Sequence, residues 1–379
     1  MNKSILRIGV DARELQYGMG GIARFLLNML RILSETGHDI VLFTNNRDGL
    51  EGLNFEVVTI PHSGIPLFED QALLCGAVRR AKLDLFLSPY YKVPLFIDCK
   101  GIITIHDLTV FKVPFLSPAF RLYLKIMVYI YALKAERIFT DSECSKNDIL
   151  QYTGLGSGKV SVVYTTVPDK YKQANGFDCG KYDIAHPFIL YVGNLCPHKN
   201  LKTLLRAYAA MGDDMKGKYR LVVVGKTRGI IGRSDQEAQY LELTGMARDL
   251  GISDKLHFVE FVEEEDLPGI YSSASLLVLP SYYEGFGLPA VEAMACGCPV
   301  IVSDRSSLPE ITGDAAVLFN PDDHKGLAEK MGLVLTDDAL KADLIAKGAA
   351  RAGFFRHDKI KNIVIEAIES IRRKRTEGD

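Results

Sequence analysis

The sequence contains no C-x-x-C pair, no D-x-D motif and no charge-free apolar run of about 18 residues. Because its seven cysteines are scattered and odd in number, we expect reduced thiols rather than a disulfide framework. Without D-x-D or a His/Cys cluster at metal-ligand spacing, no metal site and no cofactor are predicted. The formal net charge of −2 excludes the overall basic field that non-specific nucleic-acid binding requires. No signal-peptide pattern opens the chain, so the expected location is the cytoplasm. Peripheral binding to the inner face of the cell membrane is the second location that we consider.

A length of 379 residues exceeds one ordinary core and predicts two domains. Short β-rich runs alternate with longer helical patterns, and several runs are apolar at consecutive positions. Strands covered by helices on both faces have this composition, so the pattern predicts an α/β fold of two doubly wound parallel sheets. The segment 168–187 interrupts this alternation of strand and helix patterns with prolines and glycines, and it therefore marks the predicted domain boundary. The predicted parts are residues 1–170, residues 171–356, and an amphipathic helix in 357–379 that packs back, with the first domain as its candidate partner.

The most informative segment, residues 276–301, combines a buried strand, a glycine-rich loop and a helix start at Pro289, where a missing N–H is tolerated. The loop glycines let backbone amides approach a ligand closely, and the helix adds positive partial charge at the same point. Glu284 before the helix and Glu292 one turn inside it would flank an anionic ligand with hydroxyls at both ends, as a nucleotide-sugar has. The alternative is an ordinary strand–helix turn with a dipole-favoured glutamate.

Other polar groups follow predicted strands. Lys199 lies in the loop after 188–192, where the strand ends of a parallel sheet face a ligand crevice and an ammonium would neutralise a diphosphate. A solvated surface charge is the alternative for this lysine. His106 and Asp107 end the run 102–105, and a hydrogen-bonded loop pair is the alternative to a functional site there.

A glycine-rich loop follows the opening strand. Gly18, Gly20 and Ala23 spell G-x-G-x-x-A, the pattern of a dinucleotide-binding turn. The glycines come several residues after the strand, and the next predicted strand, 40–43, runs into Thr-Asn-Asn rather than an acid for the ribose. Both departures argue against an NAD-dependent oxidoreductase.

Residues 115–134 form a long apolar helical pattern with three cations, Arg121, Lys125 and Lys134. A basic amphipathic helix can lie on an anionic membrane, where it would reach a lipid-linked acceptor. The alternative is a core helix whose basic side chains extend their charges to water.

The segment E-G-F-G-L-P-A-V-E-A-M-A-C-G-C-P-V-I, which begins at Glu284, resembles the E-x7-E signature of family-4 retaining glycosyltransferases, and the resemblance extends over nearly the whole chain. It implies the GT-B fold, in which two Rossmann-like domains face a central cleft, with residues 1–170 as the acceptor-binding domain and residues 171–356 as the nucleotide-sugar-binding domain. It also implies that Glu284 lies beside hydroxyls of the transferred sugar and that Glu292 binds the ribose. The implied contacts of sugar and phosphate are the backbone amides of Gly285, Phe286, Gly287 and Leu288.

The segment 191–201 resembles the family's G-x-x-x-P-R-K-N stretch, which implies that Lys199 binds the donor diphosphate. Asn194 stands where some members have a second arginine, and His198 replaces the usual arginine beside the lysine. Lys226, after the next predicted strand, is therefore a candidate to complete the phosphate site.

In the first domain the resemblance implies three further contacts. Gly20 and Gly21 would face the donor phosphates. His106 would contact the transferred sugar and steady charge as the glycosidic bond breaks, whereas Asp107 would orient the acceptor.

These features predict a metal-independent retaining hexosyltransferase of bacterial surface-polysaccharide or glycolipid assembly, with mannose as the favoured sugar. The predicted donor is a GDP- or UDP-linked sugar, and the predicted acceptor is a saccharide or a lipid-linked acceptor. The resemblance implies retention by front-face substitution. A covalent route would need a carboxylate nucleophile at the anomeric carbon, and the sequence does not identify one. The alternatives are a GT-B scaffold that binds nucleotide-sugar without catalysis and, less favoured, an NAD-dependent oxidoreductase.

Overall fold

The computed structural model describes residues 5–17, 20–47, 50, 52–112, 117–226 and 234–376. They belong to two compact units. Unit 1 consists of Met1–Thr166 and His357–Asp379, and unit 2 of Val167–Arg356.

The division between the units falls slightly before the predicted boundary after residue 170. The segment that opens unit 2 is bonded within that unit, because the amide of Val167 donates to the carbonyl oxygen of Phe355 over 3.0 Å. The guanidinium of Arg356 likewise donates to the carbonyl oxygen of Tyr171 over 3.0 Å. These bonds tie the first residues of unit 2 to its last.

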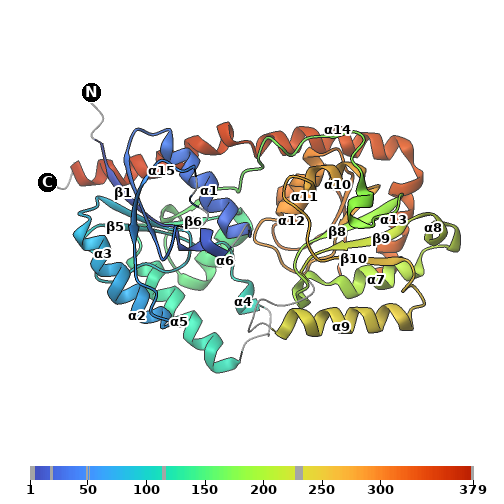
Figure 1. Ribbon diagram of the computed structural model, residues 1–379, viewed down its shortest axis with the longest axis horizontal. Helices are drawn as coiled ribbons and strands as arrows, with labels where there is room; N and C mark the ends of the chain where they lie inside the picture. The colour runs from blue at the N-terminus through green and yellow to red at the C-terminus, as the bar shows by residue number, and fades with distance from the viewer. Residues whose placement is uncertain are drawn as a thin grey trace. The chain divides into compact units, whose positions relative to one another are not determined.

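Unit 1 is built on a parallel sheet whose described strands run in the order β3-β2-β1-β4-β5-β6-β7 (Figure 1). The strands are β1 (Arg7–Asp11), β2 (Asp39–Thr44), β3 (Glu56–Thr59), β4 (Leu85–Ser88), β5 (Lys100–Thr104), β6 (Arg137–Thr140) and β7 (Val160–Val162). The helices are η1 (Arg13–Tyr17), α1 (Gly21–Ser34), α2 (Pro66–Phe68), the π-helix η2 (Glu69–Leu74), α3 (Cys75–Arg80), α4 (Thr109–Lys112), α5 (Pro118–Lys134), α6 (Glu143–Thr153), η3 (Ser157–Lys159) and α15 (His357–Thr376).

Unit 2 has a second parallel sheet, of order β10-β9-β8-β11-β12-β13 among its described strands. The strands are β8 (Phe188–Val192), β9 (Arg220–Val224), β10 (Leu256–Val259), β11 (Leu276–Leu279), β12 (Val300–Ser303) and β13 (Val317–Phe319). The helices are η4 (Cys179–Tyr182), η5 (Pro197–Lys199), α7 (Leu201–Ala210), α8 (Asp213–Lys218), α9 (Ser234–Asp249), α10 (Leu267–Ser273), α11 (Leu288–Ala295), α12 (Leu308–Thr312), α13 (His324–Thr336) and α14 (Asp338–Phe354).

Every predicted β-rich run overlaps one of these strands. The strands β4, β11 and β12, which lie inside their sheets, are buried at every residue. The predicted α/β class is therefore confirmed. In each sheet the strand order reverses beside the first strand of the unit, between β1 and β4 and between β8 and β11. Loops diverge from the carboxyl ends of the strands at such a switch point, which is where open α/β sheets bind ligands.

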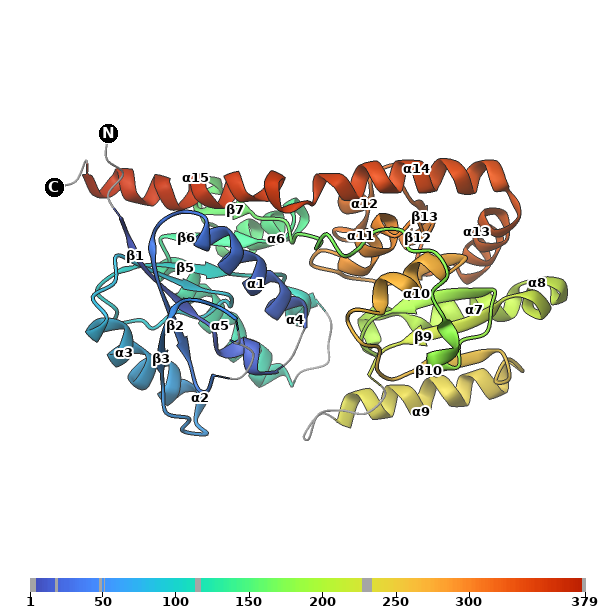
Figure 2. The same ribbon diagram turned by 45° about the horizontal axis from the view of Figure 1, so that its top comes forward.

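The C-terminal helix α15 lies beside α1 in both views (Figures 1 and 2). Its apolar side chains join the core of unit 1 with Leu26 and Leu30 of α1; they are Ile360, Val364, Ala367, Ile368 and Ile371. At the start of the helix, Nε2 of His357 lies 3.0 Å from a carboxylate oxygen of Glu35. The amphipathic pattern of this segment thus serves packing within unit 1.

Candidate functional site

The loop that precedes α11 is held by two serines that follow β12. The hydroxyl of Ser307 lies 2.9 Å from the carbonyl oxygen of Glu284 and 3.0 Å from that of Phe286, and the amide of Glu284 donates to Oγ of Ser306 over 2.8 Å. In a trans peptide the C=O and the following N–H point in opposite directions. Because both carbonyls face Ser307, the amides of Gly285 and Gly287 are both directed away from it.

Gly287 adds a helix N-terminus to these amides. It is the N-cap of α11 with φ +98°, a conformation that favours glycine. The helix begins at Leu288, with Pro289 in its first turn. The first amides of a helix have no acceptor within it and carry positive partial charge. The loop and helix therefore present several N–H groups suited to an anion.

Lys199 and Glu284 meet in the structure. Nζ of Lys199 lies 2.6 Å from Oε2 of Glu284, and the two side chains are 21% and 11% exposed. The hydroxyl of Ser281 donates to Oε1 of Glu284 over 2.7 Å. One lysine and one glutamate, both predicted to contact the donor, thus form an ion pair next to the amides of the α11 loop.

Backbone contacts between the loops after β8 and β11 set this pairing. The amide of Tyr282 donates to the carbonyl oxygen of His198 over 2.8 Å. Asn200, buried and with φ +56°, donates to the carbonyls of Pro280 and Pro321 over 3.0 and 2.9 Å. Asn200 therefore fixes the end of η5, and with it the position of Lys199.

Glu292 is buried on α11, one turn inside the helix. The hydroxyl of Tyr271, on α10, donates to its Oε2 over 2.8 Å. Its predicted contact with a ribose stays a prediction.

Lys226 is the second residue after β9, and its side chain is exposed. The preceding glycine approaches the loop after β8 closely: a Cβ at Gly225 would lie 2.1 Å from the carbonyl oxygen of Gly193. This contact brings the loop of Lys226 beside the loop of Lys199. A phosphate contact of Lys226 stays a prediction.

Gly20 and Gly21 stand at the start of α1, where Gly20 is the N-cap. Both are exposed, and a Cβ at either would meet no atom within 4 Å. Packing within unit 1 therefore does not demand glycine at these positions. Gly18, also part of the predicted loop, lies outside the described residues.

His106 is held at both ring nitrogens. Nδ1 lies 2.8 Å from Oδ2 of Asp141, and Nε2 lies 3.0 Å from the carbonyl oxygen of Pro89. Burial alone would lower the pKa of His106, but the charge of Asp141 outweighs it and the pKa is raised above its ordinary value. Since both neighbours are acceptors, the ring is best satisfied as an imidazolium. The predicted sugar contact is not tested by these bonds.

Asp107 has a local partner in the structure. Its Oδ1 accepts from the amide of Thr109 over 2.8 Å, at the start of α4. This bond matches the loop role that was the alternative for the His-Asp pair, and an acceptor contact stays a prediction.

No group of three or more His, Cys, Asp or Glu side chains suited to a metal ion occurs in the part of the chain that the structure describes. Within those same residues, no helix is both long and apolar enough to span a membrane.

Comparisons with known proteins identify the family of the chain. The chain matches Glycosyltransferase Family 4 over residues 19–171 and Glycosyl transferases group 1 over residues 182–351. It is 31% identical to the O-antigen chain mannosyltransferase RfbU of Salmonella typhimurium, over 80% of this chain and 84% of that protein. The chain belongs to the family-4 glycosyltransferases. It is also 29% identical to the O-antigen chain mannosyltransferase B of Escherichia coli, over 77% of this chain and 75% of the relative.

Solved structures show the same fold for this glycosyltransferase. Sucrose-phosphate synthase from Thermosynechococcus elongatus superposes with a TM-score of 0.79 at 19% identity, covering 99% of this chain and all 100% of that one. Anabaena HepE, solved in complex with UDP-glucose, gives 0.78 at 19% identity over 96% of this chain and 100% of its own. The GT-B fold is thereby confirmed, and the protein is a hexosyltransferase.

Three residues that position the loops of Glu284 and Lys199 were missed in the sequence. Ser306 and Ser307 hold the 284–287 loop from beyond β12, and Asn200 joins the loops after β8 and β11. The asparagine was visible at the end of the G-x-x-x-P-R-K-N stretch. The serines carry no pattern that singles them out.

Replacing Gly287 with alanine should damage the amide site directly. A Cβ there would lie 2.6 Å from Cδ2 of Leu308, and φ +98° is strained for any L side chain. We expect a loss of about 1–3 kcal/mol of local stability and a fall of at least about 100-fold in kcat/KM. Gly332→Ala on α13, where a Cβ would meet nothing within 4 Å, is the matched control. Full activity in Gly287→Ala would contradict the assigned loop geometry.

The His106–Asp141 pair predicts a pH dependence. Because the pKa of His106 is raised in the folded state, its stabilisation is fully present below the unfolded value near 6.5 and is lost as pH rises through the folded pKa. The ring titration of His106, followed by NMR, should move to lower pH in Asp141→Asn. The free energy of unfolding of the two proteins should differ most at acidic pH and converge at alkaline pH. An unshifted titration would refute the pairing.

Proposed function

We propose that this glycosyltransferase transfers a mannosyl group from a GDP- or UDP-linked donor to a saccharide, with retention and without a divalent metal. The observation that carries the proposal is the Lys199–Glu284 pair beside the amides of Gly285 and Gly287, which are directed away from Ser307. The choice of mannose is supported by the names of the relatives, several of which are mannosyltransferases. Metal independence is supported by the lack of a D-x-D motif and by a cation of the chain at the phosphate site.

In the proposed reaction, the bond between the anomeric carbon and the diphosphate oxygen breaks while the acceptor oxygen bonds to the same face. The acceptor's proton passes to the departing diphosphate. Lys199 and the amides of Gly285 and Gly287 stabilise the negative charge that grows on the leaving group, and such preorganised donors lower a barrier by about 3 kcal/mol each. Glu284 accepts hydrogen bonds from sugar hydroxyls, and Glu292 accepts one from the ribose.

A donor panel tests this proposal. Release of nucleoside diphosphate from GDP-mannose, UDP-glucose and UDP-galactose is measured with and without chelator, and the anomeric configuration of the product is read by NMR. We expect turnover of a mannose donor with chelator present and an axial-to-axial outcome. Dependence on added metal or inversion would refute the mechanism, and donor binding without turnover would favour the scaffold alternative.

Helix α5 supports a proposed membrane contact, although residues 115 and 116, at the start of the predicted pattern, lie outside the described part of the chain. The solvent-facing stripe of the helix is apolar. Its exposed large side chains are Phe120, Leu122, Tyr123, Ile126, Tyr129, Ile130 and Leu133. The helix contains Arg121, Lys125 and Lys134 but no acidic residue. Apolar side chains flanked by cations alone fit an anionic lipid surface better than a neutral protein face.

Vesicle binding measures this contact. The Ile126→Glu/Ile130→Glu variant should lose at least about tenfold in binding to phosphatidylglycerol vesicles, because each carboxylate opposes both apolar burial and the anionic surface. Leu333→Glu, at an exposed apolar position on α13, is the control. Equal binding of the wild type and the α5 variant would refute the proposed contact. A dimer in solution whose interface covers the exposed apolar side chains of α5 would refute it as well.

A further inference from the structure

The carboxyl ends of four neighbouring strands of unit 1 are joined by a chain of hydrogen bonds. The strands are β1, β4, β5 and β6, which lie in this order in the sheet. The chain begins at Asp141, directly after β6, and passes through His106, the second residue after β5. It continues through Pro89 and Tyr90 after β4 and ends at Glu14 in η1, the helix that follows β1. It therefore ties together the strand ends at which open α/β sheets bind ligands.

His106 is the residue on which this chain depends. Its two ring nitrogens face acceptors, a carboxylate oxygen of Asp141 at 2.8 Å and the carbonyl oxygen of Pro89 at 3.0 Å. A neutral imidazole has one N–H and one lone pair, so it can donate to one of these acceptors but not to both. Because the charged acceptor forms the stronger bond, loss of the ring proton releases the bond to Pro89.

The groups around His106 favour its protonated form. Burial lowers the pKa of His106, but the carboxylates of Asp141, after β6, and Asp107, next in the chain, outweigh it, so the pKa is raised. From α1 the histidine meets the uncharged ring of Phe25, edge-on, with 5.0 Å between ring centroids. From the segment after β4 it meets the carbonyl of Pro89. Asp141 is thus the main group that keeps both ring nitrogens protonated.

Asp141 is incompletely satisfied in return. It is 6% exposed, and its Oδ1 has no hydrogen-bond partner among the residues that the structure describes. A buried polar atom that is left unpaired destabilises the folded state. An apolar side chain of similar size would avoid this penalty, so a carboxylate at this position indicates a constraint other than packing.

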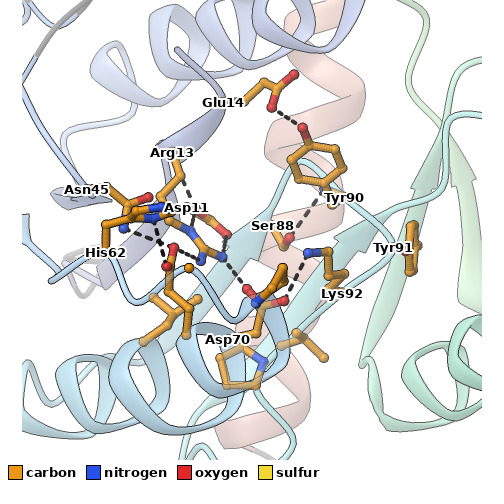
Figure 3. A pocket seen from close by; sticks show the side chains of 16 residues that line it. Asp11, Arg13, Glu14, Asn45, His62, Asp70, Ser88, Tyr90, Tyr91 and Lys92 are labelled. Carbon is orange, nitrogen blue, oxygen red and sulfur yellow. Dashed lines mark hydrogen bonds and ion pairs between the residues drawn. The ribbon is translucent and has the colours of Figure 1, made fainter. Parts of the chain in front are cut away.

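The bonds after β4 carry the position of Pro89 toward α1. The Pro89 carbonyl and the Tyr90 amide belong to one planar peptide group, so His106 sets the orientation of both. The phenol of Tyr90 donates to the carboxylate of Glu14, and Figure 3 shows these two side chains directed toward one another. Glu14 belongs to η1, which precedes α1 and its N-cap, Gly20. We therefore expect a release of the Pro89 bond to reach the start of α1.

We propose that Asp141 is a positioning residue for sugar transfer, which acts through His106 on the segments after β1 and β4 and on the start of α1. The inference rests on the proposed function and on the predicted donor contact of Gly20 and Gly21. A sugar hydroxyl could reach a ring nitrogen of His106 only by displacing Asp141 or Pro89. The histidine therefore contributes by holding these segments, and transfer fails when its ring loses the proton.

The pH profile of donor turnover is the first readout. The ratio kcat/KM is measured from acidic to alkaline pH with whichever of GDP-mannose, UDP-glucose and UDP-galactose the wild type turns over, because this ratio reports on groups of the free enzyme. It should fall on the alkaline side at the midpoint of the His106 ring titration, followed by NMR. In Asp141→Asn both midpoints should move together to lower pH. Between the wild-type and variant midpoints, kcat/KM should be about tenfold below that of the wild type.

The second readout needs no turnover. Gly20–Gly21 is the single Gly-Gly step in the chain, so glycine labelled with ¹³C at the carbonyl and with ¹⁵N gives one carbonyl–nitrogen correlation in carbon-detected NMR. This glycine signal should titrate at the midpoint of His106 in the wild type. In Asp141→Asn it should titrate at the lower midpoint of the ring.

Tyr90→Phe tests the far end of the chain. The variant loses the hydrogen bond to Glu14 but keeps the carboxylate–imidazole pair, so the ring midpoint should stay at its wild-type value while the glycine signal responds less to pH. Asp39→Asn is the matched control, because Asp39 starts β2 at the amino end of the same sheet and pairs there with Arg7. It should reproduce the wild-type profile and midpoints.

Two results would overturn the proposal: a glycine signal that does not follow the His106 titration, or a kcat/KM midpoint that Asp141→Asn leaves unchanged. If Asp141→Asn does not fold, an undiminished glycine response in Tyr90→Phe has the same force. If a sugar donor is turned over but the midpoints do not coincide, the positioning role falls and the proposed function stands. If no donor is turned over while the ring and glycine signals titrate together, the proposed function falls and the link from Asp141 to α1 stands.

Discussion

Glu284→Gln should lower kcat by about 100- to 1,000-fold while leaving the affinity for nucleoside diphosphate equal or higher. The amide keeps the shape of the side chain but loses the charge that accepts hydrogen bonds from sugar hydroxyls as the glycosidic bond breaks, and losing one preorganised group costs about 3 kcal/mol in the barrier. Removing a carboxylate 2.6 Å from Lys199 frees that cation for the diphosphate. Steady-state kinetics and calorimetric titration with UDP and GDP measure the two effects separately.

Glu329→Gln is the control for this substitution, because Glu329 is exposed on α13. It should retain the kcat of the wild type. A Glu284→Gln variant that loses nucleotide affinity but keeps kcat would show that the carboxylate acts on binding alone, against its assignment beside the transferred sugar.

Lys199→Met should show the opposite pattern, with nucleoside diphosphate and donor bound about 100-fold more weakly. The methionine removes the charge that we propose to face the diphosphate, and it leaves Glu284, only 11% exposed, without its cation. The remaining carboxylate then repels the phosphates. Because the two residues act through one contact, the effects of Lys199→Met and Glu284→Gln should not add in the double variant.

Lys202→Met supplies the comparison for Lys199, since Lys202 lies on α7 and pairs with Glu242 at the surface. A surface pair of this kind contributes little, so affinity should not change. Strict additivity of the two substitutions, or a Lys199→Met variant with wild-type affinity, would contradict the pairing as the core of the donor site.

The strands were predictable because parallel strands buried on both faces read as continuous apolar runs, as Leu276–Leu279 and Val300–Ser303 do. The helix start at Leu288 was predictable from Pro289 and the preceding glycines. Glu284 and Lys199 were each selected from a local pattern next to a strand end. That they form an ion pair was not predicted, because it depends on the contact of Tyr282 with His198 between two loops.

The contact of Glu14 with Tyr90 in unit 1 shows what local patterns miss. Glu14 and Tyr90 are far apart in the chain, and they meet only because β1 and β4 are adjacent in the sheet. The order of strands follows from how whole elements pack, which no single motif states. The start of unit 2 at Val167, a few residues before the predicted 171, likewise involves a hydrogen bond to the distant Phe355.

The central claim is that the amide of Gly287 faces a bound diphosphate. Phe286–Gly287 is the single Phe-Gly step in the chain, so labelling phenylalanine with ¹³C at the carbonyl and glycine with ¹⁵N identifies this amide alone by NMR. Adding UDP or GDP should shift its proton signal downfield, as expected for a new hydrogen bond to phosphate, whereas uridine or guanosine should leave it in place. A Gly287 signal that stays fixed at saturating nucleoside diphosphate would contradict the account.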